Sequence, residues 1–360
     1  MEKFHCKTKL ITGAGSITAL REMHIAKMFL VCDPFFEANG SAQRIIDTAG
    51  NPDFRLFTDI VPDPPIETAA NGAMQIKSFQ PDAVIALGGG STMDSAKAMV
   101  YFSGVQTRLI AIPTTSGSGS EVTSFAILTH DGVKHPLVDE KLLPNMAILD
   151  SDLVVSLPAS LVADGGFDLI SHALEAYVAT DRSAISNMFA EEAFCRAIHQ
   201  LLDSFHGDLD CRDAIHTAAT MAGIAFSHSG LGLCHAIAHS IGGEYHIPHG
   251  RLNAILLPAV IEHNAGACGH LYANLARAAG ISGGSDVIAL RALKNALIRL
   301  RKGLMLPETL AQAGISPAEI EASSNRLVMA ALNDPCCKTN PLKPDEAIIR
   351  SILSQVTGHG

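Results

Sequence analysis

The chain has 360 residues, of which 48% are hydrophobic and 17% are charged. This composition excludes an intrinsically disordered chain, which combines low hydrophobicity with high charge. The formal net charge is −10 and no block of Lys or Arg is present, which argues against a nucleic-acid partner because phosphates require a basic face.

The cysteines and the N-terminal residues indicate a cytoplasmic protein. The eight cysteines include no CxxC pair, and the opening MEKFHCKTKL lacks the apolar core of a signal peptide. We therefore expect reduced thiols. The longest apolar runs are far shorter than the roughly 20 residues of a membrane-spanning helix, so no membrane partner is expected.

The first part of the chain has the pattern of an α/β domain. Short apolar runs rich in Val, Ile and Phe are mostly separated by helix-length segments. Parallel strands cannot be joined by tight turns, so this pattern predicts a parallel, Rossmann-like sheet covered by crossover helices. We place this domain at residues 1–155. Its predicted strands include residues 28–32, 83–87, 109–112 and 147–149.

The remainder of the chain, residues 156–360, is predicted to be an all-helical domain. It is dominated by Ala, Leu, Ile, Glu and Arg and contains few strand-like runs. Apolar residues recur three and four positions apart in residues 286–302 and 317–332. This spacing is typical of helices that bury one face.

Two polar or glycine-rich loops follow predicted strands of the first domain. Gly88-Gly89-Gly90-Ser91 connects a strand to a predicted helix, where backbone N–H groups and the helix dipole favour an anion such as pyrophosphate. The alternative is a tight turn without a ligand. The loop of residues 113–121 offers hydroxyl groups at a strand end, where ligands bind in open α/β sheets. Its alternative is a polar surface loop.

Asp33 directly follows the first predicted strand. A carboxylate at this position can accept hydrogen bonds from a ribose and would repel a 2′-phosphate, which favours NAD over NADP. The alternative interpretation is a strand-ending Asp before Pro34.

The second domain contains a dense group of histidines. Five of the sixteen histidines lie between His228 and His249, and upstream Asp168 and His172 share one helical face. His235 and His239 have the same spacing and precede a predicted loop that includes His249. One carboxylate with three imidazoles suits Fe²⁺, Zn²⁺, Co²⁺ or Ni²⁺ better than Mg²⁺ or Ca²⁺. The spacing leaves open which three histidines bind, and any single one can be a packed or surface imidazole.

Five ordered motifs resemble the iron-containing (group III) alcohol dehydrogenases. Short segments such as Pro62-Asp-Pro64 resemble more narrowly the propanol dehydrogenases of propanediol-utilisation microcompartments. The five motifs are Gly88-Gly-Gly-Ser, Ile112-Pro-Thr-Thr-Ser-Gly-Ser-Gly-Ser-Glu121, Asp168-x3-His172-Ala-x-Glu-Ala-Tyr177, Gly230-Leu-Gly-Leu-Cys-His235-Ala-Ile-Ala-His239 and Pro248-His249-Gly250.

The resemblance implies a role for individual residues. It implies that His239 lies beside the nicotinamide and relays a proton. Asp63 departs from the pattern, because many relatives have Asn there. The implied metal ligands are Asp168, His172, His235 and His249. The implied coenzyme contacts are Asp33, Gly89, Gly90, Ser91, Thr114, Thr115, Ser118 and Lys134. The implied substrate-pocket residues are Phe125, Phe226 and Cys336.

The resemblance also implies an activity. The chain would use NAD(H) and Fe²⁺, with Zn²⁺ as the alternative ion, to interconvert short-chain primary alcohols and aldehydes. Propanol and propionaldehyde, or ethanol and acetaldehyde, are the expected substrates. A homodimer is expected, and residence in a bacterial microcompartment, with contacts to its shell or enzymes, is compatible with the narrower resemblance.

Three alternatives remain at this point. A glycerol-dehydrogenase-like zinc polyol dehydrogenase has a similar fold. A dehydroquinate-synthase-like lyase would need several basic residues near the metal, and the histidine segment contains only Arg251. A non-enzymatic protein that keeps the fold would have lost metal ligands, whereas all four are present.

Overall fold

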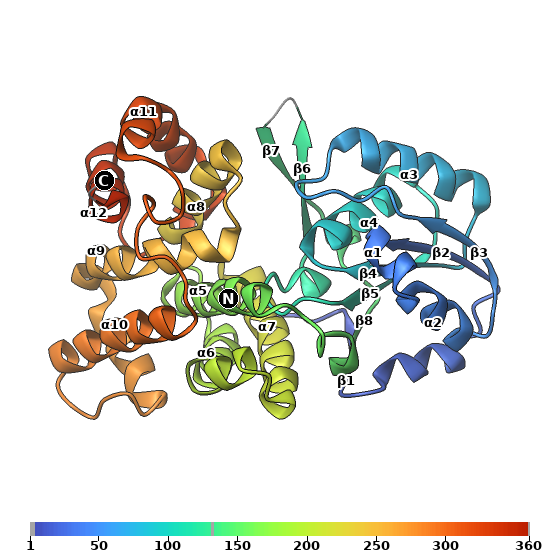
Figure 1. The fold of residues 1–360 in the computed structure, drawn as a ribbon, viewed down its shortest axis with the longest axis horizontal. Coiled ribbons are helices and arrows are strands. Elements are labelled where there is room, and N and C mark those ends of the chain that lie inside the picture. The colour runs from blue at the N-terminus through green and yellow to red at the C-terminus, as the bar shows by residue number, and fades with distance from the viewer. Residues whose placement is uncertain (1–3, 131–132, 359–360) are drawn as a thin grey trace. The chain divides into compact units, whose positions relative to one another are not determined.

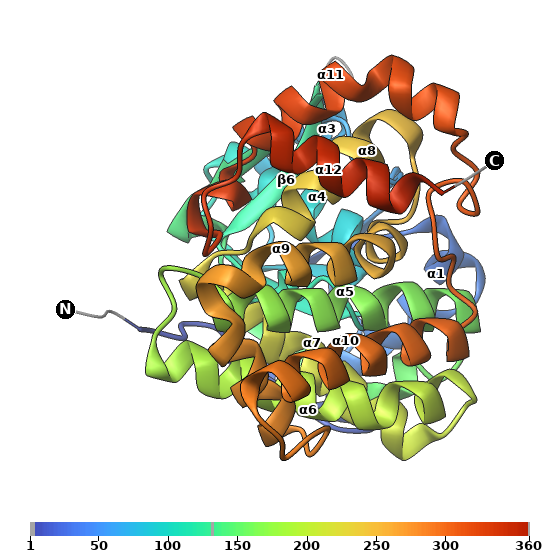
Figure 2. The same cartoon turned by 90° about the vertical axis from the view of Figure 1, so that its left-hand side faces the viewer.

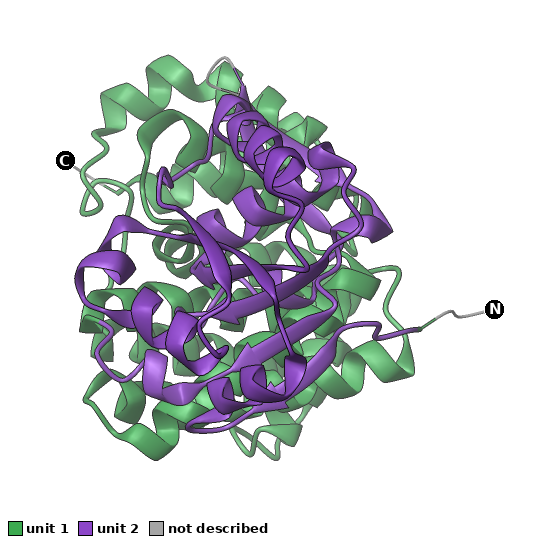
Figure 3. Ribbon diagram, turned by 90° about the vertical axis from the view of Figure 1, so that its right-hand side faces the viewer, with its two compact units in different colours: residues 1–4, 158–360 green, residues 5–157 purple. Residues whose placement is uncertain are grey.

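The computed structural model describes residues 4–130 and 133–358. Figure 3 shows that the chain divides into two compact units. One is His5–Leu157; the other begins at Pro158 and also includes Phe4.

The His5–Leu157 unit is built on a six-stranded parallel sheet with the order β1-β8-β5-β4-β2-β3. The four strands predicted from sequence correspond to β2, β4, β5 and β8 of this sheet, so the α/β prediction is confirmed. The strands are β1 (Lys9–Thr12), β2 (Lys27–Cys32), β3 (Asp53–Phe57), β4 (Ala83–Gly88), β5 (Arg108–Pro113) and β8 (Met146–Leu149).

Alternate residues of the central strands enter two hydrophobic cores, one on each face of the sheet. Phe29 and Val84 pack with α3 and α4, while Met28 and Ile85 pack with η1 and α2. Figure 1 shows α3 and α2 on opposite sides of the sheet. The helical segments of this unit are η1 (Ser16–Met23), α1 (Pro34–Ala38), α2 (Ser41–Thr48), α3 (Ile66–Phe79), α4 (Gly90–Ser103), η2 (Ser120–Val122), η3 (Glu140–Leu142) and η4 (Ser151–Leu153).

The sequence-based prediction did not include the two outer strands or a hairpin. Strands β1 and β3 are largely exposed and carry polar residues, so they lack a continuous apolar run. The hairpin consists of β6 (Phe125–His130) and β7 (Val133–Val138), which pair antiparallel.

Every secondary-structure element in the described residues 158–358 is a helix, which confirms the all-helical prediction for the described part of this unit. Helix α5 is its central element, because it packs against α6, α7 and α9 (Figure 2). The helices are α5 (Ala159–Val178), α6 (Ala184–Phe205), α7 (Leu209–Ser229), α8 (Leu233–Tyr245), α9 (His249–Ala278), α10 (Asp286–Gly303), α11 (Pro317–Asn333), η5 (Pro335–Thr339) and α12 (Glu346–Thr357).

No single helix in the described residues is both long and apolar enough to cross a membrane. Only α7 and α8 taken together are long and apolar enough, and these two helices are bent by 105° at their junction.

Candidate metal and coenzyme sites

Helix α5 carries polar side chains in the interior of the helical unit. Every residue of this helix from Gly166 to Val178 is buried, including Asp168, His172 and Glu175. Buried charged groups need partners. The partners here come from α8 and α9.

Four side chains converge on one point in this interior. The Oδ1 atom of Asp168 lies 3.9 Å from Nε2 of His172, 3.8 Å from Nε2 of His235 and 3.6 Å from Nε2 of His249. Three of the four residues are at most 9% exposed, and the side chain of His249 is 32% exposed. Asp168, His172 and His235 form a group that can hold a metal ion, and His249 faces the same oxygen from the more open side.

The donor set fits a transition-metal ion. Imidazole nitrogens are borderline ligands, and three of them with one carboxylate oxygen suit Fe²⁺ and Zn²⁺. His228 lies outside this group, where its ring stacks on Phe4 at a centroid distance of 4.2 Å. His246 ends α8 with a positive φ of 55°. The structure therefore brings together the four residues that the resemblance implied as metal ligands.

His249 lies in a different local structure from the one predicted. The sequence indicated a loop around it, whereas His249 is the first residue of α9 after Pro248. The next residue, Gly250, packs directly on α5: a Cβ atom there would lie 1.8 Å from the carbonyl oxygen of Asp164. Only glycine permits this approach, which brings His249 to the face of α5 that carries Asp168.

Further side chains orient the donor residues. Glu175 accepts a 2.6 Å hydrogen bond from Nδ1 of His235 and also accepts the backbone N–H groups of Gly232 (2.9 Å) and Cys234 (2.7 Å). Asn253 donates through Nδ2 to Oδ1 of Asp168 at 3.0 Å. Such partners fix the direction of a metal ligand.

The four groups perturb one another electrostatically. Burial would raise the pKa of Asp168, but the surrounding imidazoles of His172, His249 and His235 outweigh it and lower this pKa. Burial would lower the pKa of His235, but the carboxylates of Asp168 and Glu175 raise it to about 9. The carboxylate is therefore ready to bind a cation, and a metal ion that binds His235 displaces a proton.

His239 lies next to this group on α8. Its ring stacks on that of His249 at a centroid distance of 4.9 Å, and its Nδ1 atom lies 2.9 Å from Oδ2 of Asp334. The carboxylate can only accept, so it holds the hydrogen on Nδ1 and leaves Nε2 as the acceptor. The side chain of His239 is 24% exposed, which is compatible with proton exchange with solvent.

Six of the eight predicted coenzyme residues, Gly89, Gly90, Ser91, Thr114, Thr115 and Ser118, lie in two loops that meet at the carboxyl edge of the sheet in the His5–Leu157 unit. Gly88 and Pro113 are register partners at the ends of β4 and β5, and the N–H group of Thr114 donates to the carbonyl oxygen of Gly88 at 3.0 Å. Added Cβ atoms would lie 3.2 Å from Thr115 at Gly89, and 3.4 Å from Ser118 at Gly90. These close approaches show that the two loops are in contact.

Helix α4 begins within the first of these loops. It starts at Gly90, includes Ser91 in its first turn, and has no side-chain hydrogen bond at its N-cap Gly89. The uncapped N–H groups of a 14-residue helix point out of this edge, which is the arrangement that binds phosphate groups.

Two predicted coenzyme residues have partners within the protein. Oδ1 of Asp33 accepts the N–H of Phe35 at 2.8 Å, so this carboxylate also caps α1. Nζ of Lys134 lies 2.7 Å from Oδ1 of Asp63, the residue that departs from the family pattern. Lys134 thus pairs with a carboxylate that an Asn would not supply.

The predicted substrate-pocket residues fall into separate places. Phe226 on α7 stacks on His172 with ring centroids 4.3 Å apart, so it lies against the metal ligands. Cys336 on η5 follows Asp334, which accepts its N–H group at 2.8 Å. Phe125 belongs to the His5–Leu157 unit, where its ring centroid lies 5.8 Å from Nζ of Lys97.

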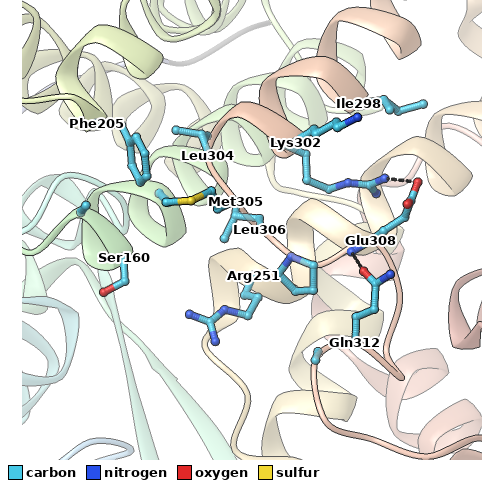
Figure 4. Close-up of a pocket in the computed structure, with 15 residues that line it drawn as sticks. Ser160, Phe205, Arg251, Ile298, Lys302, Leu304, Met305, Leu306, Glu308 and Gln312 are labelled. Atoms are coloured by element: carbon cyan, nitrogen blue, oxygen red, sulfur yellow. Dashed lines mark hydrogen bonds and ion pairs between the residues drawn. The ribbon is translucent and has the colours of Figure 1, made fainter.

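A cavity of about 870 Å³ lies elsewhere on the helical unit, between the start of α5 and the end of α10 (Figure 4). Arg251 and Arg301 line it, and Arg301 is paired with Glu308 at 3.0 Å. None of the four predicted metal ligands is among its lining residues. Arg251 connects this cavity with the predicted metal ligands. Its guanidinium donates two hydrogen bonds to Asp164, which lies one helical turn before Asp168.

Several residues of these sites were not predicted from the sequence. Glu175 and Asn253 act only through contacts between helices that are distant in the chain. Buried Lys97 was also missed: its Nζ donates to Ser120 Oγ (2.8 Å), Thr123 Oγ1 (2.9 Å) and the carbonyl oxygen of Phe125 (2.9 Å). Two signals pointed to Glu175: its place in the Asp168-x3-His172-Ala-x-Glu-Ala-Tyr177 motif, and its position seven residues after Asp168, two turns along one helical face.

Comparison with known proteins gives two family matches. A family described as "Iron-containing alcohol dehydrogenase" matches residues 7–151, and "Fe-containing alcohol dehydrogenase family, C-terminal" matches residues 162–357. Among curated proteins, the 1-propanol dehydrogenase PduQ of Salmonella typhimurium is 39% identical, with 99% of this chain and 100% of that protein covered. The NADPH-dependent butanol dehydrogenase of Clostridium saccharobutylicum is 33% identical, with 99% and 98% covered.

Solved structures agree with these matches. An iron-containing alcohol dehydrogenase from Thermococcus thioreducens superposes with a TM-score of 0.92 at 29% identity, covering 98% of this chain and 99% of that one. A 1,3-propanediol oxidoreductase gives a TM-score of 0.93 at 27% identity, covering 99% and 100%. The polyol-dehydrogenase and lyase alternatives are not favoured by these matches.

Proposed function

Because this chain belongs to the iron-containing alcohol dehydrogenase family, we propose that it interconverts short-chain primary alcohols and aldehydes with NAD(H) and Fe²⁺. Propanol and propionaldehyde, or ethanol and acetaldehyde, are the proposed substrates. The observation that carries the proposal is the convergence of three imidazole Nε2 atoms on Oδ1 of Asp168 at 3.6–3.9 Å. The likeness to PduQ supports the choice of a three-carbon aldehyde.

In this proposal Asp168, His172, His235 and His249 hold the metal ion. When bound, the ion supplies a Lewis acid for the substrate oxygen, and the coenzyme supplies or accepts the hydride. Glu175 keeps the hydrogen of His235 on Nδ1, so that its Nε2 lone pair faces the other donors. Phe226, stacked on His172, presents an apolar surface that suits a short alkyl chain.

His239 handles the proton. Aldehyde reduction consumes one proton and alcohol oxidation releases one, and an imidazole can carry it near neutral pH. The hydrogen bond from Nδ1 to Asp334 leaves Nε2 as the atom that accepts or donates this proton. The carboxylate of Asp334 also stabilises the ring when it becomes charged. Burial would raise the pKa of Asp334, but its hydrogen bonds with His239 and Cys336 hold it at about 2, so it stays ionised.

The coenzyme is proposed to bind at the carboxyl edge of the sheet, with phosphate oxygens at the first turn of α4. Asp33 follows β2, next to β4 in the sheet, and supports NAD over NADP because its charge would repel a 2′-phosphate. The NADPH-dependent butanol dehydrogenase among the relatives makes this preference a question for experiment.

The test is an activity and metal assay under anaerobic conditions. Purified protein loaded with Fe²⁺ or Zn²⁺ is assayed for NADH and NADPH oxidation with acetaldehyde, propionaldehyde and butyraldehyde, and for NAD⁺ reduction with the alcohols and with glycerol. We expect the fastest turnover with Fe²⁺, NADH and propionaldehyde or acetaldehyde. Full activity of the chelator-stripped protein, or a preference for glycerol with Zn²⁺, would contradict the proposal.

Assembly and location are also proposals. We propose a homodimer, which sedimentation at several protein concentrations tests directly. Residence in a propanediol-utilisation microcompartment is supported by the likeness to PduQ. Co-purification with intact microcompartments from the native host tests it, and recovery of the protein only in the fraction without microcompartments would contradict it.

A further inference from the structure

A second group of metal-binding side chains lies beside the four proposed iron ligands. It consists of His239 on α8 with Asp334 and Cys336 at the start of η5, and one ligand atom from each lies within 4.8 Å of the other two. We propose that this group binds a thiophilic divalent cation such as Zn²⁺ or Cd²⁺, separately from the iron site. The ligands would be Nδ1 of His239, the carboxylate of Asp334 and the thiolate of Cys336.

The spacing of the three ligand atoms suits such an ion. Bonds of about 2.0–2.3 Å from zinc to nitrogen, oxygen and sulfur place tetrahedral ligands roughly 3–4 Å apart. Atoms already within 4.8 Å reach this spacing by small side-chain rotations. All three residues are partly exposed, so an ion can enter from solvent and a water molecule can complete the coordination.

The local backbone holds the group together before any ion binds. Asp334 accepts the N–H group of Cys336 through Oδ1 at 2.8 Å and contacts His239 through Oδ2 at 2.9 Å. The start of η5 therefore fixes the carboxylate and the backbone of Cys336, while α8 carries the imidazole. Few degrees of freedom remain to be lost when the ion binds, which favours affinity.

Binding changes the protonation of two ligands. Burial and the nearby Asp334 carboxylate raise the pKa of the Cys336 thiol well above its usual value, so the thiol keeps its proton until a cation replaces it. The ion therefore releases this proton to solvent. It also takes the Nδ1 lone pair of His239, and the ring hydrogen moves to Nε2.

This exchange would inhibit the enzyme. A metal-bound His239 carries its hydrogen on Nε2 and cannot accept the proton there, so turnover falls when Zn²⁺ or Cd²⁺ is in excess. This consequence rests on the proposed function. The binding itself does not, because it depends only on the three side chains.

Sulfur makes the two sites experimentally distinct. The iron site has one carboxylate and three imidazoles, so a thiolate-to-cadmium charge-transfer band cannot come from it. Cys337 provides a matched control, because its Sγ donates to the carbonyl oxygen of Ala331 at 3.0 Å and is not part of the group.

The experiment titrates iron-loaded, anaerobic protein with CdCl₂ and records the ultraviolet thiolate-to-cadmium band, the iron content and the far-ultraviolet circular dichroism. We expect the band to saturate at a single equivalent of Cd²⁺, to be lost in Cys336→Ser and to persist in Cys337→Ser. His239→Ala should weaken Cd²⁺ binding by more than about tenfold, because removing a metal ligand costs more affinity than removing a residue that only hydrogen-bonds to a ligand.

Two outcomes overturn the inference. One is a folded, iron-loaded wild-type protein that gives no band, and the other is a band that Cys336→Ser retains. Aldehyde reduction without added Cd²⁺ is measured on the same samples. A protein that shows the band but no such activity contradicts the proposed function and leaves the second site standing. Activity without the band contradicts the second site and leaves the proposed function standing.

Discussion

Nδ1 of His235 lies 2.6 Å from Oε2 of Glu175, and this hydrogen bond joins helices α8 and α5 inside the helical unit. Both residues are almost fully buried, at 1% and 3% exposure. The same carboxylate accepts two N–H groups at the start of α8. One side chain therefore sets the position of the helix that carries His235 and the direction of its free nitrogen.

We predict that Glu175→Gln lowers metal affinity by about 10–100-fold, the usual effect of removing the partner of a metal-bound imidazole. A glutamine has one acceptor oxygen for three N–H groups, so at least one of them loses its partner. Competition with a coloured chelator measures the affinity. The control is Glu192→Gln, an exposed residue paired with Arg196, which should bind metal normally. Equal affinity in both variants would show that Glu175 does not orient His235.

His249→Ala should lose bound metal and turnover while NADH binding persists. The side chain is 32% exposed and begins a helix, so its removal should leave the fold intact. The proposed coenzyme contacts belong to the other unit and are not altered. Elemental analysis, propionaldehyde-dependent NADH oxidation and NADH fluorescence measure the three properties.

A neighbouring histidine serves as the control for this variant. His246→Asn keeps a residue that tolerates the positive φ of 55° at this position and should retain metal and activity. Normal turnover in His249→Ala would remove this residue from the proposed metal site.

Asp33→Asn is predicted to increase NADPH use relative to NADH. The amide oxygen of asparagine can still accept the N–H of Phe35 and cap α1, so the substitution removes the charge without removing the cap. The ratio of kcat/KM for the two coenzymes is the measurement. If the ratio stays the same, Asp33 serves only as the cap of α1.

Lys97→Met should destabilise the His5–Leu157 unit by about 3–5 kcal/mol, the typical cost of breaking a buried charge network. The lysine is 1% exposed, and its loss removes the positive charge near the carboxylate of Asp94, which shares Ser120 as a partner. Urea unfolding gives the change in free energy. Exposed Lys77→Met is the control and should change stability by less than about 0.5 kcal/mol. Similar midpoints for the two variants would mean that the network contributes little.

His216 should make stability depend on acid pH. Burial lowers its pKa from 6.5 to about 4, so between these values the unfolded chain binds a proton that the folded chain does not. Stability is therefore lost as pH falls from about 6.5 to about 4, by about 3 kcal/mol for this group. Unfolding of metal-free wild-type and His216→Gln protein at pH 7 and pH 4 measures this. If the wild-type and His216→Gln proteins lose the same stability between pH 7 and pH 4, His216 is not a buried neutral imidazole in the folded state.

Much of the α/β unit could be predicted because its central strands are buried on both faces. Strands such as β4 are continuous apolar runs ending in glycine, a pattern that is visible in the sequence. Strands β1 and β3 lie at the edges of the sheet and have exposed residues, so no run marks them. Pairing with β8 and β2 makes them strands, and such pairing is a tertiary contact.

For the metal group, the sequence by itself determined the kinds of ligand and one local pair, since Asp168 and His172 are four residues apart on one helix. It left the choice among the nearby histidines open, because spacing cannot show which rings from α8 and α9 turn toward α5. Tertiary packing decided this. Gly250 lets the start of α9 approach the α5 backbone, and Glu175 turns His235 toward Asp168. Both effects depend on contacts between segments more than 50 residues apart, and local sequence does not encode that proximity.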